Sequence, residues 1–133
     1  MNTLSSEFRP PQRLGQHVIA DFYDAENLLD MSDISDVLRR AANAANATVL
    51  EMRLHDFGAG YGFTGFALLA ESHISVHTWP EHHYVAIDIF MCGNADAEKS
   101  LAVLKQHFRP REEQIQRLDR GDRLAATSLE ITP

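Results

Sequence analysis

Three kinds of side chain near the middle of this sequence could carry chemistry: a serine, the only cysteine and several histidines. Ser72 follows Glu71, His77 lies five residues beyond Ser72, and Cys92 lies twenty residues beyond it. Serine and cysteine become nucleophiles beside a base, and histidine is the commonest base. Ser72 lies outside the Gly-x-Ser-x-Gly turn of the serine hydrolases. A Cys92–His77 pair could form the reactive centre of a thiol hydrolase.

The seven histidines raise the question of a metal site, but their spacing argues against one. His73 and His77 have the spacing of a helical zinc pair, yet residues 73–79 are rich in β-branched and aromatic side chains and predict a strand. Four residues along a strand span about 13 Å. That is too far for two ligands that must each lie about 2 Å from one ion. We therefore expect no metal site.

The size and composition of the chain fit a single soluble domain. It has 133 residues, 44% of them hydrophobic, and no apolar stretch approaches the roughly 20 residues that span a membrane. Its formal net charge of −7 argues against a nucleic-acid-binding protein, which would carry a basic patch. One cysteine excludes an internal disulfide, and residues 1–13 lack the apolar core of a secretory signal. We expect a cytoplasmic protein that binds neither membranes nor nucleic acids.

The candidate residues lie within a series of predicted strands and helices. Alternating apolar residues predict strands, and apolar residues at helical spacing predict helices. Helices are expected over 32–46, capped by Ser32 or Ser35, and over 95–108. Strands are expected over 15–23, 48–55, 63–70, 73–79, 83–91 and 112–118. In the second of these strands, Leu50, Met52 and Leu54 are expected to share one face.

This order of elements predicts an α+β fold. Both helices would pack on one face of a mainly antiparallel sheet, which makes a two-layer sandwich. Residues 14–118 would form the domain, with 1–13 as a mobile leader and 119–133 as a tail. The other face of the sheet would need a cover, and a partner subunit could supply it.

The segment from Glu71 to Gly93 resembles the core of a known family. It reads ESHISVHTWPE and, two residues later, YVAIDIFMCG. This is similar to the ESH, HTWPE and apolar strand ending in Cys-Gly of the short prokaryotic S-adenosylmethionine decarboxylases. The spacing between the matching residues agrees as well. The resemblance extends more weakly over residues 14–118, and it implies the same sandwich fold and a homodimer whose active sites use both subunits.

The resemblance implies that the chain cleaves itself between Glu71 and Ser72. Attack of the Ser72 hydroxyl on the Glu71 carbonyl would convert the amide to an ester, and loss of the Ser72 α-proton would leave dehydroalanine. Hydrolysis would then give a pyruvoyl group, a covalent cofactor that forms a Schiff base with the substrate amine. By the same resemblance, Thr64 and His77 assist the cleavage, and Cys92 donates the proton to the decarboxylated carbon. The alternative for Cys92 is packing as a small hydrophobic residue.

Substrate-binding roles follow from the same family. Glu81 matches a glutamate that holds ribose hydroxyls, although an ordinary solvated turn residue is the alternative. Phe57, together with Phe22 or Tyr23, could stack on the adenine, with core packing as the alternative. Asp88 is an unusual carboxylate on an apolar strand, and no role is assigned to it.

The implied function is the decarboxylation of S-adenosylmethionine to an aminopropyl donor for spermidine and polyamine biosynthesis. Thr64 stands where the family usually has serine, and the glycine-rich stretch before it departs from the family pattern. The cleavage residues therefore match better than the substrate pocket, and a pyruvoyl-dependent arginine or ornithine decarboxylase is the alternative. An unprocessed homologue that regulates another subunit is a third alternative, and the presence of all the cleavage residues argues against it.

Overall fold

A computed structural model describes residues 14–124 of the chain. Within this range the strands are β1 (Gly15–Tyr23), β2 (Val49–Asp56), β3 (Phe63–Leu69), β4 (Ser72–Trp79), β5 (Tyr84–Cys92) and β6 (Glu112–Arg120). The helices are α2 (Ile34–Ala44) and α3 (Ala97–Phe108), and a short 3-10 turn, η1 (Pro80–His82), joins β4 to β5. None of the helices in this range is long and apolar enough to cross a membrane.

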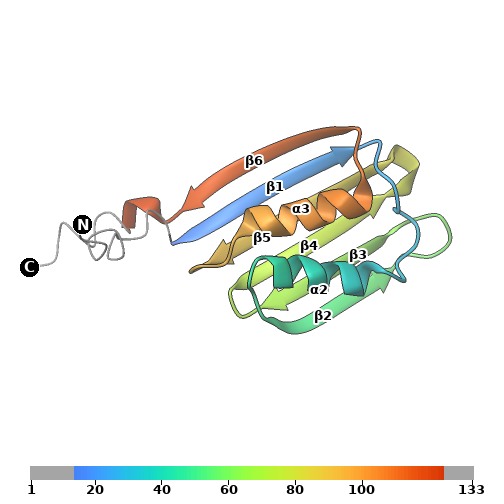
Figure 1. Cartoon of the computed structure of the whole chain (residues 1–133). Coiled ribbons are helices and arrows are strands. Elements are labelled where there is room, and N and C mark those ends of the chain that lie inside the picture. Colours follow the sequence, from blue (N-terminus) through green and yellow to red (C-terminus); the bar gives the residue numbers. More distant parts are fainter. Residues whose placement is uncertain (1–13, 125–133) are drawn as a thin grey trace, which may run out of the picture.

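The strands form one sheet in the order β2-β3-β4-β5-β1-β6, and every neighbouring pair is antiparallel. Both helices lie side by side on one face of this sheet (Figure 1). The predicted α+β sandwich of two layers is therefore confirmed.

The core lies between the helices and the sheet because each element presents one apolar side. The apolar stripes predicted for the two helices are buried: Ile34, Val37, Leu38 and Ala41 of α2, and Ala97, Leu101, Leu104 and Phe108 of α3. Alternate residues of the central strands meet them: Val18, Ala20 and Phe22 of β1, Ile74 and Val76 of β4, and Val85, Ile87 and Ile89 of β5. Burying each of the larger side chains stabilises the fold by about 1.5–3 kcal/mol.

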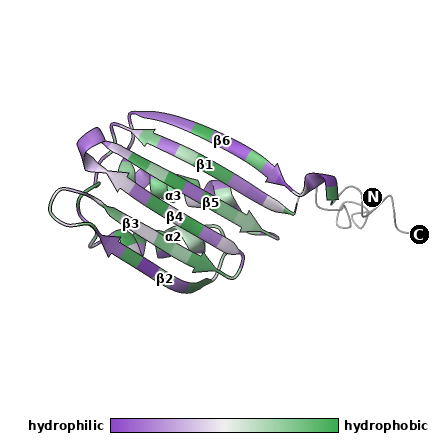
Figure 2. Cartoon of the chain, turned by 180° about the vertical axis from the view of Figure 1, so that it is seen from behind, coloured by the Kyte–Doolittle hydropathy of each residue, from purple (hydrophilic) through white to green (hydrophobic). Residues whose placement is uncertain are grey.

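The opposite side of the sheet has no helix over it, as the view from behind shows (Figure 2). We call this side the open face. Because side chains alternate along a strand, it carries His17 and Tyr23 of β1, Thr64 and Phe66 of β3, His73, His77 and Trp79 of β4, and Tyr84, Asp88, Phe90 and Cys92 of β5. These residues are half-buried or exposed, and they include both aromatic and charged groups.

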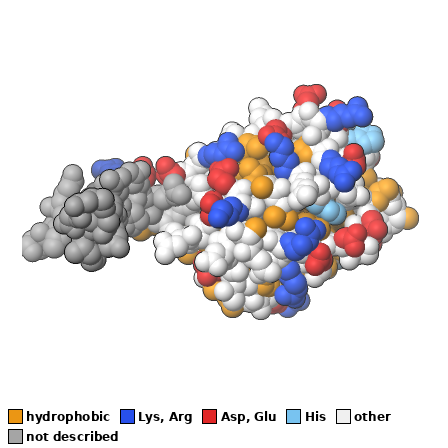
Figure 3. All heavy atoms as spheres, viewed as in Figure 1, with side chains coloured by type: hydrophobic (Ala, Val, Ile, Leu, Met, Phe, Trp, Pro, Cys, Tyr) orange, Lys and Arg blue, Asp and Glu red, His pale blue; other side chains and the backbone are white. Residues whose placement is uncertain are grey.

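The helix face, by contrast, is a solvated surface. Lys and Arg side chains are interspersed there with Asp and Glu (Figure 3). Ion pairs join Arg40 to Asp36 within α2, and Arg117 of β6 to Glu98 of α3. Such mixed, paired charge suits contact with water.

Three local predictions were wrong. α2 begins after Asp33 without a side-chain cap: Ser32 lies before the cap position, and Ser35 lies inside the helix, where its hydroxyl donates to the Met52 sulfur. Leu50 is 62% exposed, because a register shift between Val49 and Glu51 breaks the alternation of β2. β6 continues to Arg120, two residues beyond the predicted end of this strand. The leader 1–13 and the last part of the tail, 125–133, lie outside the described residues.

Candidate active site

Ser72 lies at the first position of β4, directly after a tight hairpin turn. Leu69 pairs with Ser72, which leaves only Ala70 and Glu71 in the turn between β3 and β4. The Glu71 carboxylate accepts a hydrogen bond of 2.9 Å from the backbone N–H of Thr48, which fixes the turn to the start of β2. Ser72 has a φ of 146°, in a region that side-chain-bearing residues rarely adopt. Such a conformation costs on the order of 1–3 kcal/mol and is typical of functional positions.

The carbonyl of Glu71 is held by Cys92. Its oxygen accepts the backbone N–H of Cys92 at 3.0 Å and the thiol of Cys92 at 2.9 Å. Ser72 pairs with Met91, so the last residue of β5 comes to lie beside the turn. Two donors on one carbonyl oxygen polarise the carbonyl and stabilise negative charge that develops on it. The Glu71–Ser72 peptide thus has the surroundings of an acyl group prepared for attack.

Thr64 and His77 form a second pair, at a distance from Ser72. They face each other across β3 and β4, with Thr64 Oγ1 2.9 Å from His77 Nδ1. His77 lies five residues along β4 from Ser72, which is about 16 Å in an extended strand. Within one chain, Glu71, Ser72 and Cys92 therefore lie together at one end of the open face. Thr64 and His77 lie towards the other end.

Within one chain, the same distances argue against the thiol-hydrolase pair. His77 pairs with Ala86 in the middle of β5, whereas Cys92 ends that strand. Ala86 and Cys92 are six positions apart along this strand, or about 20 Å. His77 cannot activate Cys92 of its own chain over such a distance.

A pocket of about 480 Å³ surrounds the Thr64–His77 pair. Its lining consists of Phe57, Tyr61, Thr64, His77, Thr78, Trp79 and Glu81. The volume falls in the range of small-molecule sites. Gly62 allows this shape, because a side chain there would come within 2.5 Å of the Thr78 carbonyl oxygen. The pocket unites Phe57 and Glu81, which the sequence indicated as substrate-binding, with Tyr61 and Trp79, which it did not.

The two remaining aromatic candidates, Phe22 and Tyr23, lie on opposite faces of the sheet. Phe22 is 0% exposed and belongs to the core under the helices, so it takes the packing alternative and cannot stack on a ligand in this conformation. Tyr23, one residue further along β1, faces the other way, is 39% exposed and stacks on Tyr84. Together with Trp79 and His82 these two tyrosines line a second pocket of about 410 Å³ beside the first.

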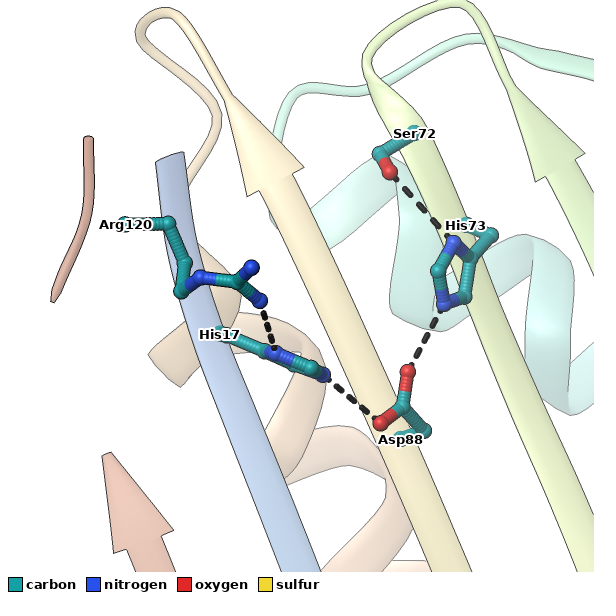
Figure 4. A network of polar contacts seen from close by, with 5 residues as sticks. All are labelled: His17, Ser72, His73, Asp88 and Arg120. Atoms are coloured by element: carbon teal, nitrogen blue, oxygen red, sulfur yellow. Dashed lines mark hydrogen bonds and ion pairs between the residues drawn. The ribbon is translucent and has the colours of Figure 1, made fainter. Parts of the chain in front are cut away.

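Asp88 turns out to be the centre of a polar network that the sequence did not predict (Figure 4). Its two carboxylate oxygens contact His17 and His73, each at 2.7 Å. Burial alone would raise the pKa of Asp88, but the hydrogen bonds and charges of the two histidines outweigh it and hold the pKa below its ordinary value. The signal in the sequence was a lone carboxylate on an apolar strand. Histidines on two neighbouring strands complete the network, and only the sheet order brings them together.

The described part of the chain contains no group of three or more His, Cys, Asp or Glu side chains arranged to hold a metal ion. His73 and His77 do lie on a strand, as predicted from the sequence. His73 binds Asp88 and His77 binds Thr64, so the two rings have separate partners.

Comparison with known proteins agrees with this fold. Residues 16–121 match the S-adenosylmethionine decarboxylase family. The S-adenosylmethionine decarboxylase proenzyme of Thermomicrobium roseum is 36% identical over 109 residues, which cover 81% of this chain and 94% of that protein. The proenzyme of Acidithiobacillus ferrooxidans is 41% identical over 98 residues, which cover 71% of this chain and 73% of that protein.

A solved structure gives the same result. The crystal structure of the adenosylmethionine decarboxylase from Aquifex aeolicus superimposes with a TM-score of 0.75 at 34% identity, and the match covers 84% of this chain and 93% of that one. Both the sequence match and the structural match extend over nearly all of the sheet and both helices. The chain therefore belongs to the S-adenosylmethionine decarboxylase family.

Proposed function

We propose that this chain is a proenzyme that cleaves itself between Glu71 and Ser72 and then decarboxylates S-adenosylmethionine for polyamine biosynthesis. One observation carries the proposal: the Glu71 carbonyl accepts two hydrogen bonds from Cys92 and is joined to a serine with a strained backbone. Membership in the family supports the choice of substrate.

The cleavage chemistry follows from the groups at the turn. Ser72 Oγ attacks the neighbouring Glu71 carbonyl, and the two donors of Cys92 stabilise the negative charge on its oxygen. Breaking the amide at this position releases the strained φ of Ser72, which favours the ester. In the second step the His77 of a second chain, with the Thr64 hydroxyl bound to its ring, removes the Ser72 α-proton, and the Glu71 carboxylate leaves.

The surroundings of residue 72 fit a pyruvoyl group. After cleavage this residue begins β4, which stays paired with β3 on one side and β5 on the other. A pyruvoyl group supplies an electrophilic ketone that binds a substrate amine and takes up the electrons released with carbon dioxide. Cys92 is an exposed thiol 2.9 Å from the carbonyl oxygen of the preceding residue, Glu71, so it is placed to give its proton to the substrate carbon.

The pocket suits an adenosyl group. Phe57, Tyr61 and Trp79 provide aromatic faces, and the Glu81 carboxylate can accept two hydrogen bonds from ribose hydroxyls. The same carboxylate could hold the cationic end of arginine or ornithine. The aromatic lining supports S-adenosylmethionine, because the flat adenine ring can stack on these side chains.

A homodimer resolves the separation within one chain. The pocket and His77 lie about 16 Å from Ser72 along β4, so a second chain packed on the open face could bring its own pocket and His77 to this serine. The mixture of aromatic and charged residues on that face supports such an interface. A reducing cytoplasm is the expected location, because it keeps the Cys92 thiol in the form that the reaction needs.

A substrate panel on the cleaved protein tests the proposal. Carbon dioxide release is measured with S-adenosylmethionine, arginine and ornithine at equal concentration. We expect release from S-adenosylmethionine alone. Release from arginine or ornithine instead would assign the alternative activity, and an intact chain that never cleaves would exclude both activities.

A further inference from the structure

The first step of self-cleavage needs a base beside Ser72, and the open face holds one. The hydroxyl of Ser72 lies 3.4 Å from Nδ1 of His73, and Nε2 of His73 lies 2.7 Å from the Asp88 carboxylate. Figure 4 shows the three side chains in line, with the His73 ring between the hydroxyl and the carboxylate. This is the order of groups in a serine nucleophile, its histidine base and an orienting acid.

We propose that His73 is the base that activates Ser72 for self-cleavage and that Asp88 positions His73 for this task. The inference rests on the proposed function, since it concerns the first step of the proposed cleavage. It adds a catalytic residue, His73, and a positioning residue, Asp88.

The hydrogen-bond pattern fixes which nitrogens carry protons. Arg120 can only donate, so Nδ1 of His17, which lies 3.1 Å from it, must accept, and Nε2 of His17 then carries its proton towards Asp88. An ionised Asp88 can only accept, so Nε2 of His73 also carries a proton. A neutral His73 therefore directs the lone pair of Nδ1 at the Ser72 hydroxyl, as a base must.

The His73 ring is also fixed by packing. It stacks on Phe66 of β3 at a centroid distance of 5.6 Å and meets the edge of Phe90 of β5 at 6.1 Å. These aromatic contacts and the bond to Asp88 hold the ring plane in one orientation. The 3.4 Å approach to Ser72 is at the long end for a hydrogen bond, as is common in catalytic pairs before reaction.

The proposed step is an isomerisation that balances without any co-reactant. The Ser72 hydroxyl gives its proton to Nδ1 of His73 while Oγ bonds to the carbonyl carbon of Glu71. The carbon–nitrogen bond of the peptide then breaks, and His73 returns the proton to the departing nitrogen. The products are an ester between Glu71 and Ser72 Oγ and a free amine on Ser72.

His73 and His77 would thus serve two different steps. His73 lies next to Ser72 in the same chain, whereas His77 lies about 16 Å further along the strand. Ester formation would use the chain's own histidine, and the later removal of the α-proton would use a histidine of the second chain. The two steps can therefore be tested separately.

The test uses the full-length protein with His77→Ala, in which the ester should accumulate. Hydroxylamine cleaves an ester and leaves an amide intact, so the fragments that it produces report ester formation. Adding His73→Ala to this variant should slow the formation of these fragments by at least ~10²-fold, the usual effect of losing a positioned base. Free imidazole should restore the rate of fragment formation. An exposed histidine elsewhere, changed as His83→Asn, is the matched control and should have no effect.

Asp88 needs a measurement that a purely structural residue would not affect. If its charge orients His73, Asp88→Glu should retain more ester formation than Asp88→Asn. If it only fills space, Asp88→Asn should retain more, because asparagine has the same size. His73→Gln, which can still bond to Asp88 but cannot accept a proton, covers the case in which His73→Ala fails to fold.

The possible outcomes are distinct. Unchanged fragment formation in His73→Ala or His73→Gln would overturn the proposal, and so would a loss in folded His73→Ala that imidazole does not restore. A protein with native His73 that neither cleaves itself nor yields fragments with hydroxylamine would instead overturn the proposed function.

Discussion

The thiol sulfur of Cys92 lies 2.9 Å from the carbonyl oxygen of Glu71, although the two residues are 21 positions apart. The pairing of Ser72 with Met91 produces this contact, since it places the end of β5 beside the β3–β4 turn. One side chain can therefore act twice. In the proposed reaction it donates to the carbonyl under attack before cleavage, and afterwards the same thiol would lie beside the position where the new group forms.

The first prediction concerns the cleavage itself. Purified protein should consist of two fragments, residues 1–71 and 72–133, the second blocked at its N-terminus by a ketone. The fragments should separate only in denaturant, because β3 of the first fragment pairs with β4 of the second, and β1 pairs with β5 and β6. Intact-mass spectrometry in native and denaturing solution measures both properties.

Ser72→Ala is the control for this cleavage, because it removes the hydroxyl and leaves a side chain of nearly equal size. It should remain one chain of 15.0 kDa. Unmodified protein that keeps this mass after long incubation would contradict the prediction.

The layers of the fold were predictable from the sequence, but the long-range contacts of the site were not. The apolar stripes of the helices and the alternation in β1, β4 and β5 follow from local periodicity alone. The Asp88 network joins His17 and His73 through the order of three strands, and nothing in the local sequence specifies that order. Phe22 and Tyr23 show the same limit. Which of these two adjacent residues is buried depends on which face of the sheet the helices cover.

The second prediction concerns the pocket. Glu81→Gln keeps the shape of the side chain but removes its charge, so hydrogen bonds to ribose hydroxyls weaken. We expect KM for S-adenosylmethionine to rise about 10- to 100-fold, the usual range for losing hydrogen bonds to a charged group, with cleavage unaffected. Glu26→Gln, an exposed glutamate outside the pocket, is the matched control. Equal KM values in both variants would place the substrate elsewhere.

The third prediction concerns pH and His107. Burial and the nearby charge of Arg40 lower the pKa of His107 from its ordinary value of 6.5, against an opposing effect of Asp33. Below pH 6.5 the unfolded chain binds a proton here more readily than the folded one, so stability must fall as pH decreases through this range. Thermal unfolding at pH 5.5 and 7.5 should show a smaller difference for His107→Gln than for the unmodified protein. Identical differences would show that His107 does not titrate in this way.

The fourth prediction concerns assembly. If each active site takes Ser72 from one chain and His77 from the other, a mixture of two inactive variants should regain activity. Co-expressed Ser72→Ala and His77→Ala chains should give roughly a quarter of normal activity, since half the dimers are mixed and each has one complete site. Only the His77→Ala chain should be cleaved. Inactive mixed dimers, isolated by two different tags, would show that the sites are not shared.

The last prediction separates the two roles of Cys92. Cys92→Ala keeps the backbone N–H on the Glu71 carbonyl but removes the thiol, so cleavage should slow and still reach completion. Decarboxylation should then fall by ~10²-fold or more, the usual scale for losing a positioned acid.

Cys92→Ser is the informative companion. Its hydroxyl can still donate to the carbonyl, so cleavage should recover, but it is a far weaker acid than a thiol, so decarboxylation should stay slow. Protonation at the wrong carbon would convert the pyruvoyl group to alanine, which mass spectrometry of the second fragment detects during turnover. Normal turnover by fully cleaved Cys92→Ala would remove Cys92 from the mechanism and leave it a packing residue.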